Sequence, residues 1–175
     1  VYVLYMDKVL LFDDARKAVL YGAFFGAAYL FPLLGGWLGD QVIGQTRTLT
    51  AGVIMMAAGY IGLAVSGVDS LGPFYVGLAL IAMGTGIFKV NMSALVGNVY
   101  RDAPDLKDAG FNIYYMGVNL GFTMGPLIAT FVGAYWNDYR ITFWIASAGM
   151  LGALGCIALG RKTLKLSDRL HQVQA

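Results

Sequence analysis

A lysine interrupts a long apolar run of the sequence and is the first candidate for chemistry. Lys89 lies in GIFKVNMSALVG, residues 86–97, and no carboxylate stands within one helical turn of it. A charge in such surroundings is costly, and ionisable residues inside membranes mostly mark substrate or ion pathways. We interpret Lys89 as a functional residue. The alternative is a structural salt bridge to a partner outside this chain or to a missing helix start.

The composition indicates which surroundings the chain is built for. Of 175 residues, 58% are hydrophobic and 13% are charged, whereas soluble domains carry about 25% charged residues. This balance favours lipid as the solvent. The net charge of +2 is too small to suggest nucleic acid as a partner. One cysteine and one histidine make neither a disulfide nor a metal site, and no nucleophile–base pair is visible. We therefore expect no enzyme, no metal and no cofactor.

Five segments are long and apolar enough to cross a bilayer, which takes about 20 residues. They cover residues 18–38, 48–66, 73–99, 109–136 and 141–160. The sequence therefore predicts an all-α integral membrane protein. Residues 1–12 are interpreted as the end of a truncated first transmembrane helix, residues 18–161 as helices two to six, and residues 162–175 as a tail or the start of a linker.

Lysine and arginine in the loops predict the orientation. Seven of these cations lie on the side that holds Arg47, Arg101 and the segment after residue 161, and four lie on the other side. Because cytoplasmic loops are the richer in Lys and Arg, we expect the tail after residue 161 to be cytoplasmic.

Three polar side chains are predicted to reach one depth. Lys89 and Asn119 each lie ten residues from the expected cytoplasmic end of their helix, and Tyr29 lies nine residues from its own. At 1.5 Å per residue these depths are about 13–15 Å, the middle of the hydrocarbon core. Four-residue spacing adds further candidates for lining a shared cavity, since such residues share a helix face. They are Thr85 and Ser93 beside Lys89, and Asn112 and Tyr115 beside Asn119. The alternative for tyrosine and asparagine is a hydrogen bond between helices.

Other residues are assigned to packing. Asn91 lies roughly opposite Lys89 on the same predicted helix and is expected to bond to a neighbouring helix. Small residues at regular spacing let helices approach closely, so several glycines predict packing seams. These are Gly22 and Gly26, then Gly117, Gly121 and Gly125, then Gly149, Gly152 and Gly155.

Three stretches resemble known transporters. GGWLGDQVIGQTRTLTAG, 35–52, resembles the loop between helices two and three of the major facilitator superfamily, with Gly36, Asp40, Gly44 and Arg47 in the motif positions. There we expect an Asp40–Arg47 ion pair. KDAGFNIYYMGVNLG, 107–121, and GTGIFKVNMSALVG, 84–97, resemble the signatures of the proton-dependent oligopeptide transporter family. Val90 replaces the family's usual proline, and Phe122 a small residue.

The resemblance implies the amino-terminal six-helix bundle of a major facilitator fold in the cell (inner or plasma) membrane. It implies proton-coupled symport of di- and tripeptides, with the proton as the coupling ion and a missing carboxy-terminal bundle as partner. Lys89 would contact the peptide's carboxyl end or couple to protonation, Asn119 would bind its backbone, and Tyr29 would face the same pocket. The alternatives are a major facilitator transporter of another small solute and a non-transporting membrane scaffold subunit.

Overall fold

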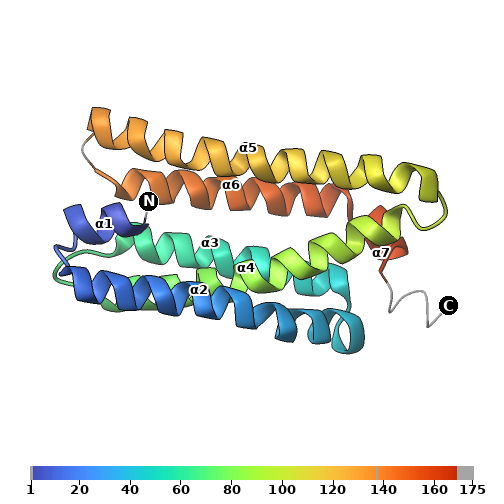
Figure 1. Ribbon diagram of the computed structural model, residues 1–175, viewed down its shortest axis with the longest axis horizontal. Helices are drawn as coiled ribbons and strands as arrows, with labels where there is room; N and C mark the ends of the chain where they lie inside the picture. The colour runs from blue at the N-terminus through green and yellow to red at the C-terminus, as the bar shows by residue number, and fades with distance from the viewer. Residues whose placement is uncertain (1, 137, 169–175) are drawn as a thin grey trace.

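Seven α-helices and one π-helical turn make up the computed structural model, which describes residues 2–136 and 138–168 (Figure 1). In chain order they are α1 (Tyr2–Lys8), α2 (Asp14–Trp37), the π-helical turn η1 (Leu38–Val42), α3 (Gln45–Val65), α4 (Gly72–Val99), α5 (Pro104–Trp136), α6 (Arg140–Leu159) and α7 (Arg161–Leu166).

Within the described residues, five helices are long and apolar enough to span a membrane: α2 with η1, α3, α4, α5 and α6. The all-α membrane fold predicted from hydropathy is therefore confirmed. Two boundaries differ from the predicted segments. Helical backbone after α2 continues through η1 to Val42, and α5 begins at Pro104, because proline fits the first turn of a helix, where its missing N–H has no intrahelical partner.

Close packing is concentrated on α3 and α4, with α2 covering α4 and α6 covering α3. Glycines make these contacts possible. A Cβ added at Gly84 of α4 would lie 2.6 Å from the carbonyl oxygen of Gly52 in α3, and one at Gly77 would lie 2.6 Å from that of Gly59. A Cβ at Gly35 of α2 would lie 2.7 Å from the Cα of Ile87. Only glycine lets these backbones approach so closely.

The packing seams predicted from glycine spacing are wrong for the described chain. A Cβ added at any of the eight glycines singled out on α2, α5 and α6 would meet no atom within 4 Å. Sequence spacing showed small residues on one helix face, but it could not show which faces meet another helix of this chain.

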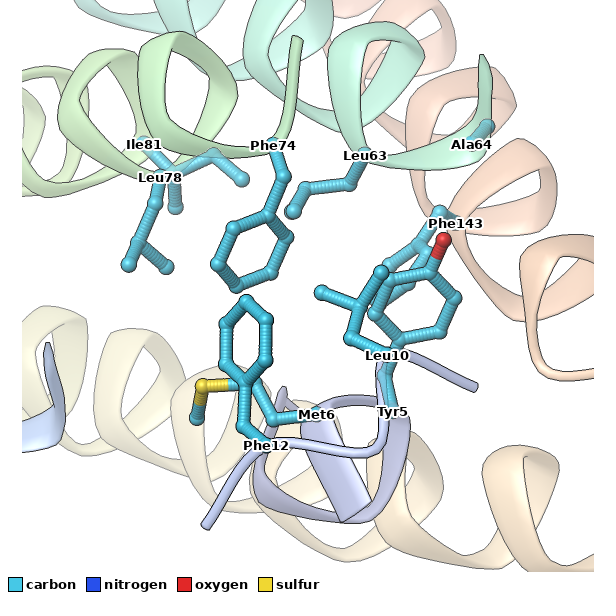
Figure 2. Close-up of a cluster of buried hydrophobic side chains, with 10 residues drawn as sticks. All are labelled: Tyr5, Met6, Leu10, Phe12, Leu63, Ala64, Phe74, Leu78, Ile81 and Phe143. Atoms are coloured by element: carbon cyan, nitrogen blue, oxygen red, sulfur yellow. The ribbon is translucent and has the colours of Figure 1, made fainter. Parts of the chain in front are cut away.

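One hydrophobic cluster closes the end of the bundle away from η1. Figure 2 shows side chains from α1 and the following loop, among them Tyr5 and Phe12, packed against Phe74 of α4 and Phe143 of α6. The hydroxyl of Tyr5 lies 2.8 Å from the carbonyl oxygen of Ser66 and donates to it. The short α1 is thus anchored in the core, and α2, α3 and α4 are held at that end.

Candidate functional site

Lys89 lies on the face of α4 that neither α2 nor α3 covers. Gly86 and Ile87 pack against α2, Gly84 packs against α3, and Lys89 is exposed between these contacts. Within the described residues its ammonium group makes no hydrogen bond and no ion pair. The described part of the chain therefore supplies no partner for a structural salt bridge.

Tyr29 and Asn119 are also on uncovered helix faces. Tyr29, on α2, is 76% exposed, and Asn119, on α5, is exposed. Neither side chain makes a hydrogen bond to another described residue, although the main-chain oxygen of Asn119 accepts one from Thr123 at 3.0 Å. The three candidates thus come from three helices, and their side-chain polar atoms make no hydrogen bond within the described chain.

Helix contacts fix the relative heights of Lys89 and Asn119. The ring of Tyr100, after α4, occupies the space beside Gly110 of the antiparallel α5, so these two residues share a level. Lys89 lies eleven residues before Tyr100, about 16 Å, and Asn119 lies nine residues after Gly110, about 14 Å. Lys89 and Asn119 therefore differ by only about 3 Å in height.

Tyr29 lies at a different level, contrary to the depth computed from the sequence. Pro32 contacts Gly86 and Gly35 contacts Ile87, so α2 and α4 run parallel in a known register. Counting from these contacts places Tyr29 roughly 10 Å farther from η1 than Lys89. The sequence estimate measured depth from Leu38, but helical backbone continues to Val42, which accounts for about 6 Å of the difference.

The four residues predicted to line the cavity beside Lys89 and Asn119 differ in their burial and contacts. Thr85 points to α3, where its hydroxyl lies 3.5 Å from the Met56 sulfur, and Ser93 is half-buried. Asn112 and Tyr115 are exposed on α5, and the ring of Tyr115 stacks on that of Phe111. Thr85 is therefore partly engaged in packing, whereas the two α5 residues remain free of other helices.

Asn91 bonds to a neighbouring helix, as predicted. It is only 2% exposed, and its side-chain amide donates to the carbonyl oxygens of Gly35 in α2 and of Ile87 in its own helix, both at 2.9 Å. The α2–α4 contact beside Lys89 is therefore fixed by a buried hydrogen bond as well as by glycines.

Hydrogen bonds of side-chain amides hold the loop motif together. The predicted Asp40–Arg47 ion pair is wrong. The Gln45 side chain donates to Asp40 at 2.7 Å and accepts from Asn98 at 2.9 Å, which links η1, α3 and α4. Arg47 is exposed and, within the described residues, makes no ion pair with Asp40. Gly44 connects η1 to α3 with φ of 91°, a conformation that favours glycine. Gly36 sits in ordinary contact with Val90 of α4.

The sequence model of the POT family (PTR2) matches residues 46–171 of this chain. This match decides which family the chain belongs to. The chain belongs to the POT family. It is 38% identical over 164 residues to the uncharacterized transporter YclF of Bacillus subtilis, covering 92% of this chain and 33% of that protein. It is 35% identical over 161 residues to dipeptide and tripeptide permease A of Edwardsiella piscicida, covering 92% and 32%.

Solved structures of POT transporters share the fold. A crystal structure of a mutant peptide transporter POT in complex with alafosfalin is 36% identical, with a TM-score of 0.82, and the match covers 95% of this chain and 34% of that one. The chain therefore spans about a third of the length of the relatives it matches. With five candidate spans, this POT-family chain is a multi-pass membrane protein.

Sequence reasoning missed one residue of this POT-family chain, Asp168. Asp168 is buried, with only 3% of the residue exposed. Its carboxylate accepts hydrogen bonds from the backbone N–H groups of Gln45 at 3.2 Å and Thr46 at 2.9 Å. It thus satisfies free donors at the start of α3, where a negative charge is also favourable. Because more than 120 residues separate it from α3, no local sequence pattern could signal the contact.

Replacing Asp168 by alanine should lower the free energy of unfolding by about 1–2 kcal/mol, the usual cost of losing such a cap. Thermal unfolding of the purified protein measures this, with Asp69→Ala as the control because Asp69 is an exposed loop residue of the same charge. Equal stability of the two variants would show that the cap contributes nothing.

Proposed function

We propose that the protein containing this chain is a proton-coupled symporter of di- and tripeptides that works by alternating access. Membership of the POT family supports this, as do relatives whose names include dipeptide and tripeptide permease and solved structures of peptide transporters. We further propose that the tail after residue 161 faces the cytoplasm and that the protein lies in the cell membrane.

The observation that carries the proposal is the mid-helix ammonium of Lys89 on an uncovered face. No described residue neutralises it, so it is available to a substrate carboxylate. A peptide brings such a carboxylate at one end. In a site closed off from water the attraction between these charges is much stronger than in solution.

The placement of the other candidates suits the rest of a short peptide. Asn119, near the level of Lys89, can both donate to and accept from a peptide group. Tyr29 lies roughly 10 Å farther along the bundle, by the register given above. An extended chain covers at most about 3.5 Å per residue, so a tripeptide spans that interval and a dipeptide covers about two thirds of it. The proposed site therefore runs along α4 from Lys89 towards Tyr29.

A second bundle would complete the site. Secondary transporters hold their substrate between two halves that rock around it, and the exposed candidates would form one wall of such a site. The proposal needs no cofactor beyond the proton. Within the described residues, no group of three or more metal-ligating side chains gathers.

Uptake into proteoliposomes tests the proposal. Full-length protein should accumulate labelled dipeptide when the outside is acidified, and a protonophore should abolish the accumulation. The 175-residue chain alone should accumulate none, because it supplies one wall of the site only. Excess unlabelled tripeptide should compete, whereas nitrate or glucose should not.

Two outcomes would reject this function in favour of the alternatives. Competition by nitrate or a sugar, without competition by peptide, would indicate a major facilitator transporter of another solute. A folded full-length protein that takes up none of these compounds would favour the scaffold subunit.

A further inference from the structure

A cavity of about 550 Å³ lies away from the proposed peptide site, between α3 and α6 and next to the α2–α3 loop. It opens to the surface, since Val42, Ile43 and Ile54 on its lining are 41–52% exposed. None of the residues proposed to bind peptide lines it. Its lining residues are Val42, Ile43, Gly44, Thr46, Arg47, Thr50, Ala51, Ile54, Leu154, Ile157, Ala158, Arg161 and Asp168.

The two walls of this cavity are apolar and end in cations at the same end of the bundle. On α3 the lining extends over eight residues from Arg47 to Ile54, and on the antiparallel α6 and its end it extends over eight residues from Leu154 to Arg161. Each run is about 10 Å long. The cavity is thus an apolar slot about two helical turns deep. The guanidinium groups of Arg47 and Arg161 lie at its open end, the mouth of the slot.

Asp168 is the one acidic side chain among the described lining residues. Its carboxylate is turned to the start of α3, where it accepts from the backbone of Gln45 and Thr46. These donors and the positive end of the helix offset much of its charge. Arg47 and Arg161 are both exposed, so the mouth of the slot retains a positive character.

We propose that this slot binds an anionic phospholipid. The phosphate group would lie between Arg47 and Arg161, since guanidinium groups bind phosphate oxygens with paired hydrogen bonds. An acyl chain would lie between α3 and α6, against Ala51, Ile54 and Ile157. Both features are needed: the apolar walls favour a chain, and the paired cations favour a negatively charged headgroup over a neutral one.

Titration of the full-length protein in neutral detergent tests this, with bound lipid counted by native mass spectrometry. Phosphatidylglycerol should bind more tightly than phosphatidylcholine. The double variant Arg47→Gln, Arg161→Gln should weaken phosphatidylglycerol binding roughly tenfold or more and remove the preference. The control Lys8→Gln, Lys107→Gln removes the same charge outside the slot and should bind as the parent does.

A second variant tests the apolar part and does not touch the charges. Ala158 is exposed on the slot wall, so Ala158→Trp should fill the slot without disturbing the core and should reduce phosphatidylglycerol binding. Equal binding of the two lipids by the parent, or equal loss in the control pair, would overturn the proposal. So would displacement of phosphatidylglycerol by an equal concentration of inorganic phosphate, which would identify a site for free anions.

Discussion

Replacing Lys89 by glutamine in the full-length protein should reduce proton-driven accumulation of dipeptide about a hundredfold or more. Removing one partner of a desolvated charge pair typically costs about 3–5 kcal/mol, and every 1.4 kcal/mol is a factor of ten. The fold should survive, because Lys89 is exposed and bonds to no described residue. Initial uptake rates in proteoliposomes, with unfolding temperatures measured beside them, check both parts.

Lys107→Gln is the matched control for this variant. Lys107 is an exposed lysine near the start of α5, and its replacement removes the same charge away from the proposed site. It should transport as the parent does. A Lys89→Gln protein that unfolds readily would instead support the structural interpretation of the lysine.

Replacing Gly84 by leucine should destabilise the protein severely, by about 3 kcal/mol or more. A Cβ at this position would lie 2.6 Å from the Gly52 carbonyl oxygen and 2.8 Å from the Met56 side chain. Overpacking commonly costs about 1–3 kcal/mol, and here the obstructing atoms include backbone, which cannot move aside as a flexible side chain can. The expected result is loss of folded, monodisperse protein on size-exclusion chromatography.

Gly149→Leu provides the comparison. A Cβ there meets nothing within 4 Å, and leucine is a better helix former than glycine, so this variant should be as stable as the parent. If both leucine variants behaved alike, the α3–α4 contact would not depend on the close approach described above.

The sequence predicted the helices well because hydropathy is a local property. Every predicted span from residue 18 to residue 160 coincides with a long apolar helix. The packing between them was not predictable in this way. Gly117 stands in a regular four-residue glycine pattern and Gly84 does not, yet of the two only Gly84 meets another helix of the described chain. Regular glycine spacing shows that small residues share one face of a helix. The tertiary arrangement decides whether another helix covers that face.

The candidate site likewise combines features that the local sequence predicts with features that depend on tertiary contacts. The lysine was found because a charge in an apolar run is costly, which needs no knowledge of neighbours. Relative depth was less accurate, because helix ends were assumed to lie at one level. Helical backbone beyond α2 continues to Val42, and the register of α2 against α4 places the two helix ends at different levels; together these separate Tyr29 from the level of Lys89. The loop contacts were harder still. Charge alone suggested Arg47 as the partner of Asp40, but the backbone geometry brings Gln45 to that carboxylate.

The most direct test of the central claim is a binding cycle on the full-length protein with two ligands and two proteins. Equilibrium binding of alanyl-alanine and of its carboxyl-terminal amide would be measured for the parent and for Lys89→Gln. If Lys89 binds the peptide carboxylate, the parent should prefer the free acid by about tenfold or more, and the variant should bind both ligands alike. A parent that binds acid and amide equally, or a variant that keeps the full preference for the acid, would contradict the account.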